Sequence, residues 1–147
     1  MAKANVTWLK GKQFMAVDSS RHSVVVSSQD EDNGVGCKPA ELLLVALASC
    51  TAVDVVEILA KKRMPLAGLE IEAIGEQDAN PPWAYRHIHL IYRLRGEKLT
   101  AAGVEQAIRL SEERYCSVAA TIRGVAQITW EYQLEAPELA ALSEMAV

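Results

Sequence analysis

The stretch PAELLLVALASCTAVDVVEILAKKR, residues 39–63, decides the fold of this chain and has Cys50 at its centre. Residues 42–48 form an uninterrupted apolar run, so a helix built from them is apolar on nearly every side. Pro39 suits a first helical turn, and the three basic residues at the end suit a last turn, where cations interact favourably with the helix dipole. We therefore predict one helix over residues 39–63 that is buried in a core.

The predicted helix is long for a chain of this size. At about 1.5 Å per residue it extends over roughly 37 Å, which is more than a small monomeric core covers. We therefore expect the residues on either side of Cys50 to contact a second subunit. A transmembrane helix is not expected, because Glu41, Asp54 and Glu57 interrupt the apolar run well short of about 20 residues.

Composition limits the class of protein. The chain has 147 residues, of which 50% are hydrophobic and 23% charged, so we expect a single soluble domain over residues 1–147. A net charge of −4 provides no basic field for phosphate backbones, and nucleic acid is not an expected partner. The N-terminal segment lacks the apolar region of a secretion signal, so the expected location is the reducing cytoplasm.

The three cysteines, Cys37, Cys50 and Cys116, lie far apart and form no CxxC pair. In a reducing compartment they are more typical of reactive thiols than of structural disulfides. His87 and His89 lie two residues apart and could face one metal ion, but two histidines on a half-exposed strand face are more often solvated. We expect neither a metal nor another cofactor.

Hydrophobic alternation and turn residues predict the other elements. Thr100 is the expected N-cap of a second helix, and Gly124 the expected end of a short helical turn. The tail either adds a helical turn begun at Pro137 or is loose. The order of elements, without an internal repeat or a glycine-rich phosphate loop, indicates an α+β fold. The expected strands are residues 5–17, 22–28, 68–77, 86–95 and 125–134, and the second helix covers about 101–114.

Two widely separated cysteines, one within a predicted helix and one just after another, suit a peroxidatic and a resolving thiol. The first thiolate attacks a peroxide O–O bond, becomes a sulfenic acid and condenses with the second thiol. A buried cysteine is more often a small core residue, so the spacing alone leaves both interpretations open.

The surroundings of Cys50 bear on this choice. Asp54 follows it by four residues and Glu57 by seven, on the same helix face, and carboxylates there disfavour a thiolate unless cations pair with them. Cys50 therefore needs a positive neighbour from elsewhere in the chain. The candidates are Arg21, His22, Arg86, His87, His89 and Arg114.

Two cysteine motifs, PAELLLVALASCTAVDVV and LSEERYCSV, resemble the osmotically inducible protein C and organic hydroperoxide resistance (OsmC/Ohr) family. The segments NPPWAYRHIHLIYRL and AQITWEYQL are similar to it as well, and the likeness covers roughly residues 13–134, closest to a less characterised OsmC-like branch. The resemblance implies an OsmC-like fold in which strands wrap around two long central helices. It also implies an intertwined homodimer with active sites at the subunit interface.

The resemblance further implies site residues and partners. In active members the cysteine of the central helix attacks an organic hydroperoxide, the later cysteine resolves it as a disulfide, and a dithiol such as a lipoylated protein reduces that disulfide. Cys50 and Cys116 match these positions. The peroxidases also use an N-terminal arginine and a glutamate ten residues before the reactive cysteine. Here Ala40 occupies that position, so Glu41 and Arg21 are the candidates for these roles.

Two functional hypotheses follow. The first is a cytoplasmic thiol peroxidase of the oxidative stress response, in which a Cys50 sulfenic acid formed by an organic hydroperoxide is resolved by Cys116. The second, which the missing glutamate favours, is a non-catalytic dimer that binds a small apolar ligand or acts as a redox sensor. A purely structural role of both cysteines is a third possibility. No nucleic acid or membrane partner is expected.

Overall fold

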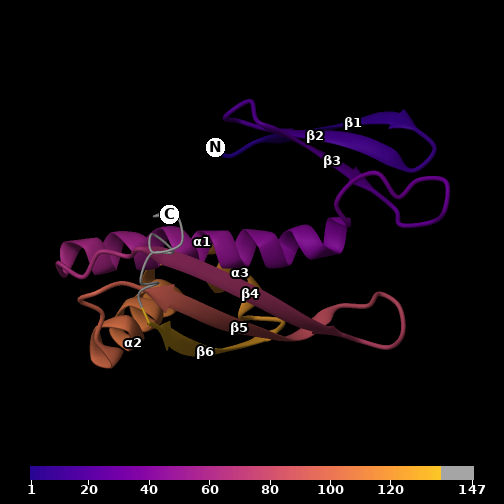
Figure 1. Ribbon diagram of the computed structural model, residues 1–147. Coiled ribbons are helices and arrows are strands. Elements are labelled where there is room, and N and C mark those ends of the chain that lie inside the picture. Colours follow the sequence, from indigo (N-terminus) through magenta and orange to yellow (C-terminus); the bar gives the residue numbers. More distant parts are fainter. Residues whose placement is uncertain (137–147) are drawn as a thin grey trace, which may run out of the picture. The chain divides into compact units, whose positions relative to one another are not determined.

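The computed structural model describes residues 1–136, so the predicted helical turn at Pro137 lies outside the described residues. The chain forms two compact units, Met1–Val45 and a second unit that begins at Ala46 (Figure 1). Helix α1, Pro39–Lys61, begins in the first unit and continues in the second. Two sheets and three α-helices make up the described chain, which confirms the predicted α+β class.

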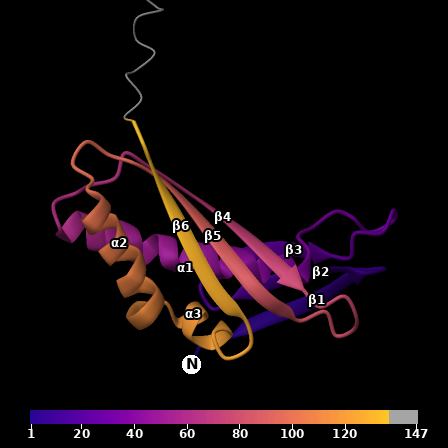
Figure 2. The same ribbon diagram turned by 90° about the horizontal axis from the view of Figure 1, so that it is seen from below.

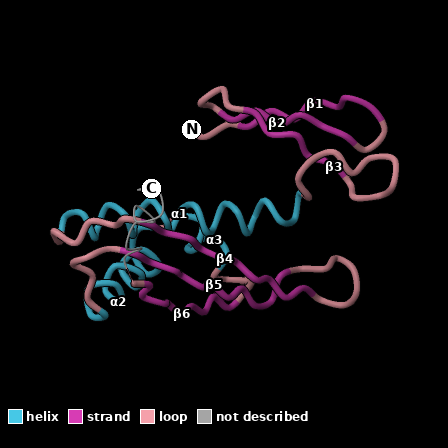
Figure 3. The backbone as a smooth tube through the Cα atoms, viewed as in Figure 1, coloured by secondary structure: helices cyan, strands magenta, loops and turns pink. Residues whose placement is uncertain are grey.

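The first unit contains an antiparallel sheet in the order β1-β2-β3, drawn in magenta in Figure 3. The prediction of one strand over residues 5–17 is wrong, because the chain turns at Gly11 and Lys12 in the middle of it. Gly11 has φ of 50°, a conformation that glycine adopts without strain, and the Lys12 N–H donates to Asn33 Oδ1 at 2.9 Å. The strands are β1 Ala4–Lys10, β2 Gln13–Asp18 and β3 Ser23–Ser27.

The second unit contains a sheet in the order β4-β5-β6, seen from below in Figure 2. Its strands are β4 Gly68–Gln77, β5 Tyr85–Arg95 and β6 Gln127–Glu135. Strand β4 pairs with β5 antiparallel, whereas β6 pairs with β5 parallel. A parallel pair needs a long crossover connection, and the helical segment between β5 and β6 supplies it.

This crossover contains α2 Ala101–Leu110, a five-residue π-helical segment η1 Ser111–Tyr115, and α3 Ser117–Ile122. Thr100 is the N-cap of α2, as predicted, and its hydroxyl accepts from the Gly103 N–H at 3.1 Å. The second helix was expected to continue to residue 114, but it stops being α-helical at Leu110. The difference matters because η1 leads directly to Cys116.

The core of the second unit is built on one face of β5. The side chains that the alternation assigns to this face, Ile88, Leu90, Tyr92 and Leu94, are each at most 1% exposed. Tyr92 hydrogen-bonds to Thr51 of α1, and its register partner Tyr132 donates to Glu105 of α2 at 2.8 Å. Both helices therefore lie on this face of the sheet. Their buried residues are Leu47, Thr51, Val55 and Leu59 of α1 and Gly103, Val104, Ala107 and Ile108 of α2.

The opposite face of α1 is apolar and exposed. Val53 is 66% exposed and Val56 47% exposed. By length and composition alone, helix α1 could cross a membrane, so Glu41, Asp54 and Glu57 do not by themselves exclude a transmembrane helix. The core helix of a soluble protein meets the same criterion. An apolar helix face that the other described elements of its own unit leave uncovered is typical of an interaction surface.

Helix α1 ends at Lys61, two residues earlier than predicted, in a Schellman turn. The Met64 N–H donates to the Leu59 carbonyl at 2.9 Å, and the Arg63 N–H donates to the Ala60 carbonyl at 3.0 Å. This turn places Arg63 at φ of 60°, in the left-handed region where glycine is the favoured residue.

We therefore expect Arg63→Gly to raise the free energy of unfolding by about 1 kcal/mol, because glycine relieves the left-handed strain. Urea unfolding followed by circular dichroism measures this change. Arg63→Ala keeps the Cβ atom and serves as the control, which should not be stabilised. A glycine variant no more stable than the alanine variant would contradict the assignment.

Candidate active site

The structure brings Cys50 and Cys116 together within the second unit. Cys50 lies in the middle of α1 and is partly buried, whereas Cys116 lies between η1 and α3 and is 2% exposed. Cys50 helps to raise the pKa of the Cys116 thiol, as a hydrogen-bonding neighbour and through its charge, so the two thiols lie close together. Two cysteines far apart in the sequence thus form one thiol pair.

The backbone around Cys116 holds its thiol in place. Cys116 is the N-cap of α3, and its Sγ accepts from the Ala119 N–H at 3.3 Å. The Cys116 N–H donates to the Ser111 carbonyl at 2.8 Å, which closes the π-helical turn η1. Such turns are rare and occur frequently at functional sites.

Burial sets the protonation of Cys116. Loss of water around it raises the pKa of the Cys116 thiol to about 11, and the hydrogen bond to Cys50 acts in the same direction. The backbone N–H groups of Ala119 and Val118 oppose this shift. At neutral pH Cys116 is therefore a protonated thiol, which suits a resolving role rather than the first attack.

Polar groups surround the thiol pair. The Asp54 carboxylate on α1 accepts from the buried Ser111 hydroxyl at 2.8 Å. Burial raises the pKa of Tyr92, the hydrogen bond to Thr51 opposes this, and the charges of Glu112, Cys116 and Asp54 raise it further. The Tyr92 hydroxyl is therefore neutral and lies close to Cys116 and Asp54.

Glu112 follows Ser111 and is also partly withdrawn from water. Burial raises the pKa of its carboxyl, while a hydrogen bond from Trp130 and the charge of Arg123 oppose the shift. Arg123 also donates to the Glu112 backbone carbonyl. The Arg123 contact fixes the backbone of η1 one residue after Ser111.

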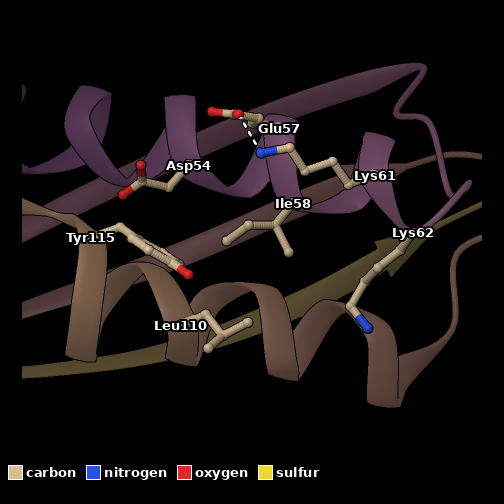
Figure 4. Close-up of a pocket in the computed structure, with 7 residues that line it drawn as sticks. All are labelled: Asp54, Glu57, Ile58, Lys61, Lys62, Leu110 and Tyr115. Atoms are coloured by element: carbon tan, nitrogen blue, oxygen red, sulfur yellow. Dashed lines mark hydrogen bonds and ion pairs between the residues drawn. The ribbon is translucent and has the colours of Figure 1, made fainter.

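A cavity of about 560 Å³ opens beside this cluster, between α1 and the α2–η1 segment (Figure 4). Asp54 and Tyr115 lie at one end of it and Lys62 at the other, with Ile58 and Leu110 between them (Figure 4). Glu57 and Lys61 complete the lining and pair with each other at 2.6 Å. The cavity therefore combines apolar side chains with charged ends.

The other predicted site residues, Glu41 and Arg21, belong to the first unit. Glu41 is exposed and pairs with Lys38 at 2.7 Å. Arg21 is exposed between β2 and β3 and has φ of 67°. Because both thiols belong to the second unit, the roles of these two residues stay predictions.

The histidine candidates are not next to the thiols in their unit. His87 and His89 alternate with the buried residues of β5 and lie on the face of the sheet opposite Tyr92. Both rings hydrogen-bond to Thr129 Oγ1, at 2.7 and 2.8 Å. Within residues 1–136, no group of three or more histidine, cysteine or acidic side chains is arranged to hold a metal ion.

Sequence reasoning missed Ser111 as a site residue. The available signal was a serine on the apolar face of a predicted amphipathic helix, where an unpaired hydroxyl would be costly. Sequence reasoning did not single out Thr51 or Tyr92 as site residues either. Their polar groups carry the hydrogen bond that joins α1 to the sheet next to Cys50.

Cys116 should titrate with a midpoint near pH 11, because burial and the Cys50 hydrogen bond both favour the thiol over the thiolate. The ¹³Cβ chemical shift of labelled Cys116, followed against pH, measures the midpoint. In Cys50→Ala the midpoint should fall, since one cause is removed, but stay above that of an exposed cysteine because burial is the larger cause. A wild-type midpoint at or below pH 9 would refute this account of the thiol.

Comparison with known proteins agrees with this fold. The family model for OsmC-like proteins matches residues 29–131. Protein YhfA of Escherichia coli (strain K12) is 33% identical over 134 residues, which cover 91% of this chain and 98% of YhfA. The crystal structure of a hypothetical protein from Aquifex aeolicus VF5 is 30% identical, with a TM-score of 0.78, over 92% of this chain and 98% of that one.

A more distant structure shares the fold alone. The organic hydroperoxide resistance protein OhrB of Bacillus subtilis is 13% identical, with a TM-score of 0.63, over 90% of this chain and 98% of its own. The family match and the likeness to YhfA confirm the resemblance found in the two cysteine motifs. The chain belongs to the OsmC-like protein family.

Proposed function

We propose that this protein is a thiol-dependent peroxidase that reduces organic hydroperoxides in the cytoplasm. The observation that carries the proposal is the proximity of the Cys50 and Cys116 thiols, which come from distant parts of the sequence and lie close enough for Cys50 to raise the pKa of Cys116. Neighbouring thiols can be oxidised to a disulfide, whose sulfurs lie about 2.05 Å apart. Membership of the OsmC-like family supports the proposal, and the shared fold with an organic hydroperoxide resistance protein is consistent with it.

The two cysteines have different roles in the proposed reaction. The Cys50 thiolate attacks one peroxide oxygen, the O–O bond breaks, and the other oxygen takes up a proton and leaves as the alcohol. Cys50 is then a sulfenic acid. The sulfur of Cys116 attacks the sulfur of Cys50, and the Cys116 proton leaves with the hydroxyl group as water. A dithiol such as a lipoylated protein reduces the resulting disulfide by exchange and is itself oxidised.

The cavity beside Asp54 supplies a place for the organic part of the substrate. Ile58 and Leu110 offer apolar contact between its charged ends. Hydrogen peroxide has no group to fill this space, so the cavity favours organic hydroperoxides through the free energy of burying their apolar surface.

The active form is, in this proposal, an intertwined homodimer around two central α1 helices. The exposed apolar side chains of Val53 and Val56 on α1 support it, because a second subunit would remove them from water. Glu41 and Arg21 are proposed to complete the site in the assembled dimer.

A specific observation also favours the alternative, a non-catalytic dimer that binds a small apolar ligand or senses oxidants. Asp54 lies one turn after Cys50, and Ala40 stands where the family peroxidases have a glutamate. A carboxylate near the thiols disfavours the thiolate that a peroxidase requires. The alternative predicts ligand-dependent thermal stabilisation without peroxide consumption.

Cys50→Ser should abolish the reduction of cumene hydroperoxide, because it removes the sulfur that attacks the peroxide. Cys116→Ser should consume one equivalent per subunit and stop at a Cys50 sulfenic acid, which dimedone traps for mass spectrometry. The consumption of hydroperoxide with and without dithiothreitol measures both effects. Cys37→Ser is the matched control and should keep full turnover, while wild-type activity in Cys50→Ser would reject the proposal.

Val53→Glu should shift the protein from dimer towards monomer, because it places a charge on the apolar face of α1. Sedimentation velocity at micromolar concentration measures the change. Val125, which is 63% exposed on the turn before β6, provides Val125→Glu as a control that should remain dimeric. A wild-type protein that sediments as a monomer would contradict the proposed assembly.

A further inference from the structure

We infer that Asp54 and Ser111 form a positioning pair that holds Cys116 within reach of Cys50. The inference deepens the proposed function and rests on the thiol pair that it assigns. The pair consists of the Asp54 carboxylate on α1, the helix that carries Cys50, and the Ser111 hydroxyl on η1, the segment that leads to Cys116. Neither residue attacks the peroxide, so both act through the cysteines.

Asp54 supplies the anchor on α1. It lies four residues after Cys50, which places the two side chains one above the other on the same helix face. Its Oδ2 accepts from the Ser111 Oγ at 2.8 Å, a short and well-formed hydrogen bond to a carboxylate. The bond joins α1 to the crossover one turn away from the first cysteine.

Ser111 connects Asp54 to Cys116, because its side chain bonds Asp54 and its backbone bonds Cys116. Its side chain is fully buried, its hydroxyl donates to Asp54, and its carbonyl accepts the Cys116 N–H at 2.8 Å. Its own N–H donates to the carbonyls of Ala107 and Ile108. Ser111 is thus fixed by α2, bonded to α1, and bonded to the backbone of the second cysteine.

The π-helical turn makes this arrangement possible. The bond from Cys116 to Ser111 runs over five residues instead of the four of an α-helix. One additional residue therefore lies between Ser111, which bonds Asp54, and Cys116, which contacts Cys50. This spacing lets Ser111 and Cys116 both reach α1, although neither belongs to an α-helix.

The pair also places a charge near the thiols. The groups around it are Glu57 and Lys61 on α1, Glu112 on η1, Tyr92 on β5 and the Cys116 thiol itself. Glu57 and Lys61 form their own ion pair, at 2.6 Å. The hydrogen bond of Asp54 therefore positions Cys116, while the charge of Asp54 disfavours the thiolate. The two effects can be separated by substitution.

Two substitutions make this separation. Ser111→Ala removes the donor and leaves the carboxylate, whereas Asp54→Asn removes the charge and keeps an oxygen that accepts from Ser111. The measurement is the equilibrium of the Cys50–Cys116 dithiol with oxidised glutathione, which yields the protein disulfide and two molecules of reduced glutathione. Cys37→Ser serves as the background in every protein, so that no third thiol takes part.

We expect Ser111→Ala to lower this equilibrium constant at least tenfold, which equals about 30 mV for a two-electron couple. The equilibrium constant of Asp54→Asn should stay within threefold of that of the background protein. Its rate of disulfide formation should reach half-maximum at a lower pH. Glu70→Gln removes an exposed carboxylate of β4 that pairs with Arg93 outside the cavity, and it is the control, with neither quantity changed.

A purely structural role would destabilise the dithiol and disulfide forms equally, which lowers the melting temperature without changing the equilibrium constant. An unchanged constant in Ser111→Ala therefore overturns the inference. If Ser111→Ala does not fold, Asp54→Ala removes the acceptor at a half-buried position and must show the same loss. Glutathione replaces the peroxide here, so the test remains decisive even if hydroperoxides are not reduced.

Discussion

Burial of the apolar face of β5 is the constraint on which the second unit depends. Its four large side chains are withdrawn from water, and each such burial contributes about 1.5–3 kcal/mol. Helix α1 covers this face with a stripe of every fourth residue, which fixes the rotation of the helix about its axis. Because Thr51 belongs to that stripe and hydrogen-bonds to Tyr92, the rotation also fixes the position of Cys50 beside the sheet.

The crossover between β5 and β6 brings the second thiol to the same place. Parallel pairing of β6 requires a long connection, and α2, η1 and α3 form it over the buried face. The site that results is poor in water and contains carboxyl groups from Asp54 and Glu112. Such surroundings keep Cys116 protonated, and in the proposed reaction Cys50, the more exposed thiol, is the nucleophile. The same surroundings that stabilise the protonated thiol of Cys116 therefore lower the reactivity of Cys50.

Strong periodicity made much of the second unit predictable. The alternation in β5, the N-cap at Thr100 and a helix that begins at Pro39 agree with the structure. The hairpin turn at Gly11 was missed because one glycine between strand-like residues gives a weak signal. The π-helical turn was missed because packing against α1, rather than local preference, decides it. The paired motifs singled out Cys50 and Cys116 as candidates. Ser111 was not singled out, because a helical pattern does not reveal which polar residue is buried with a partner.

The most direct test of the central claim is a peptide map, under non-reducing conditions, of the fully reduced protein after one equivalent of cumene hydroperoxide. A parallel sample receives the same amount of hydrogen peroxide. The account predicts rapid formation of one disulfide, between Cys50 and Cys116, and faster formation with the organic peroxide. Slow oxidation scattered over several residues, or a disulfide that contains Cys37, would contradict it.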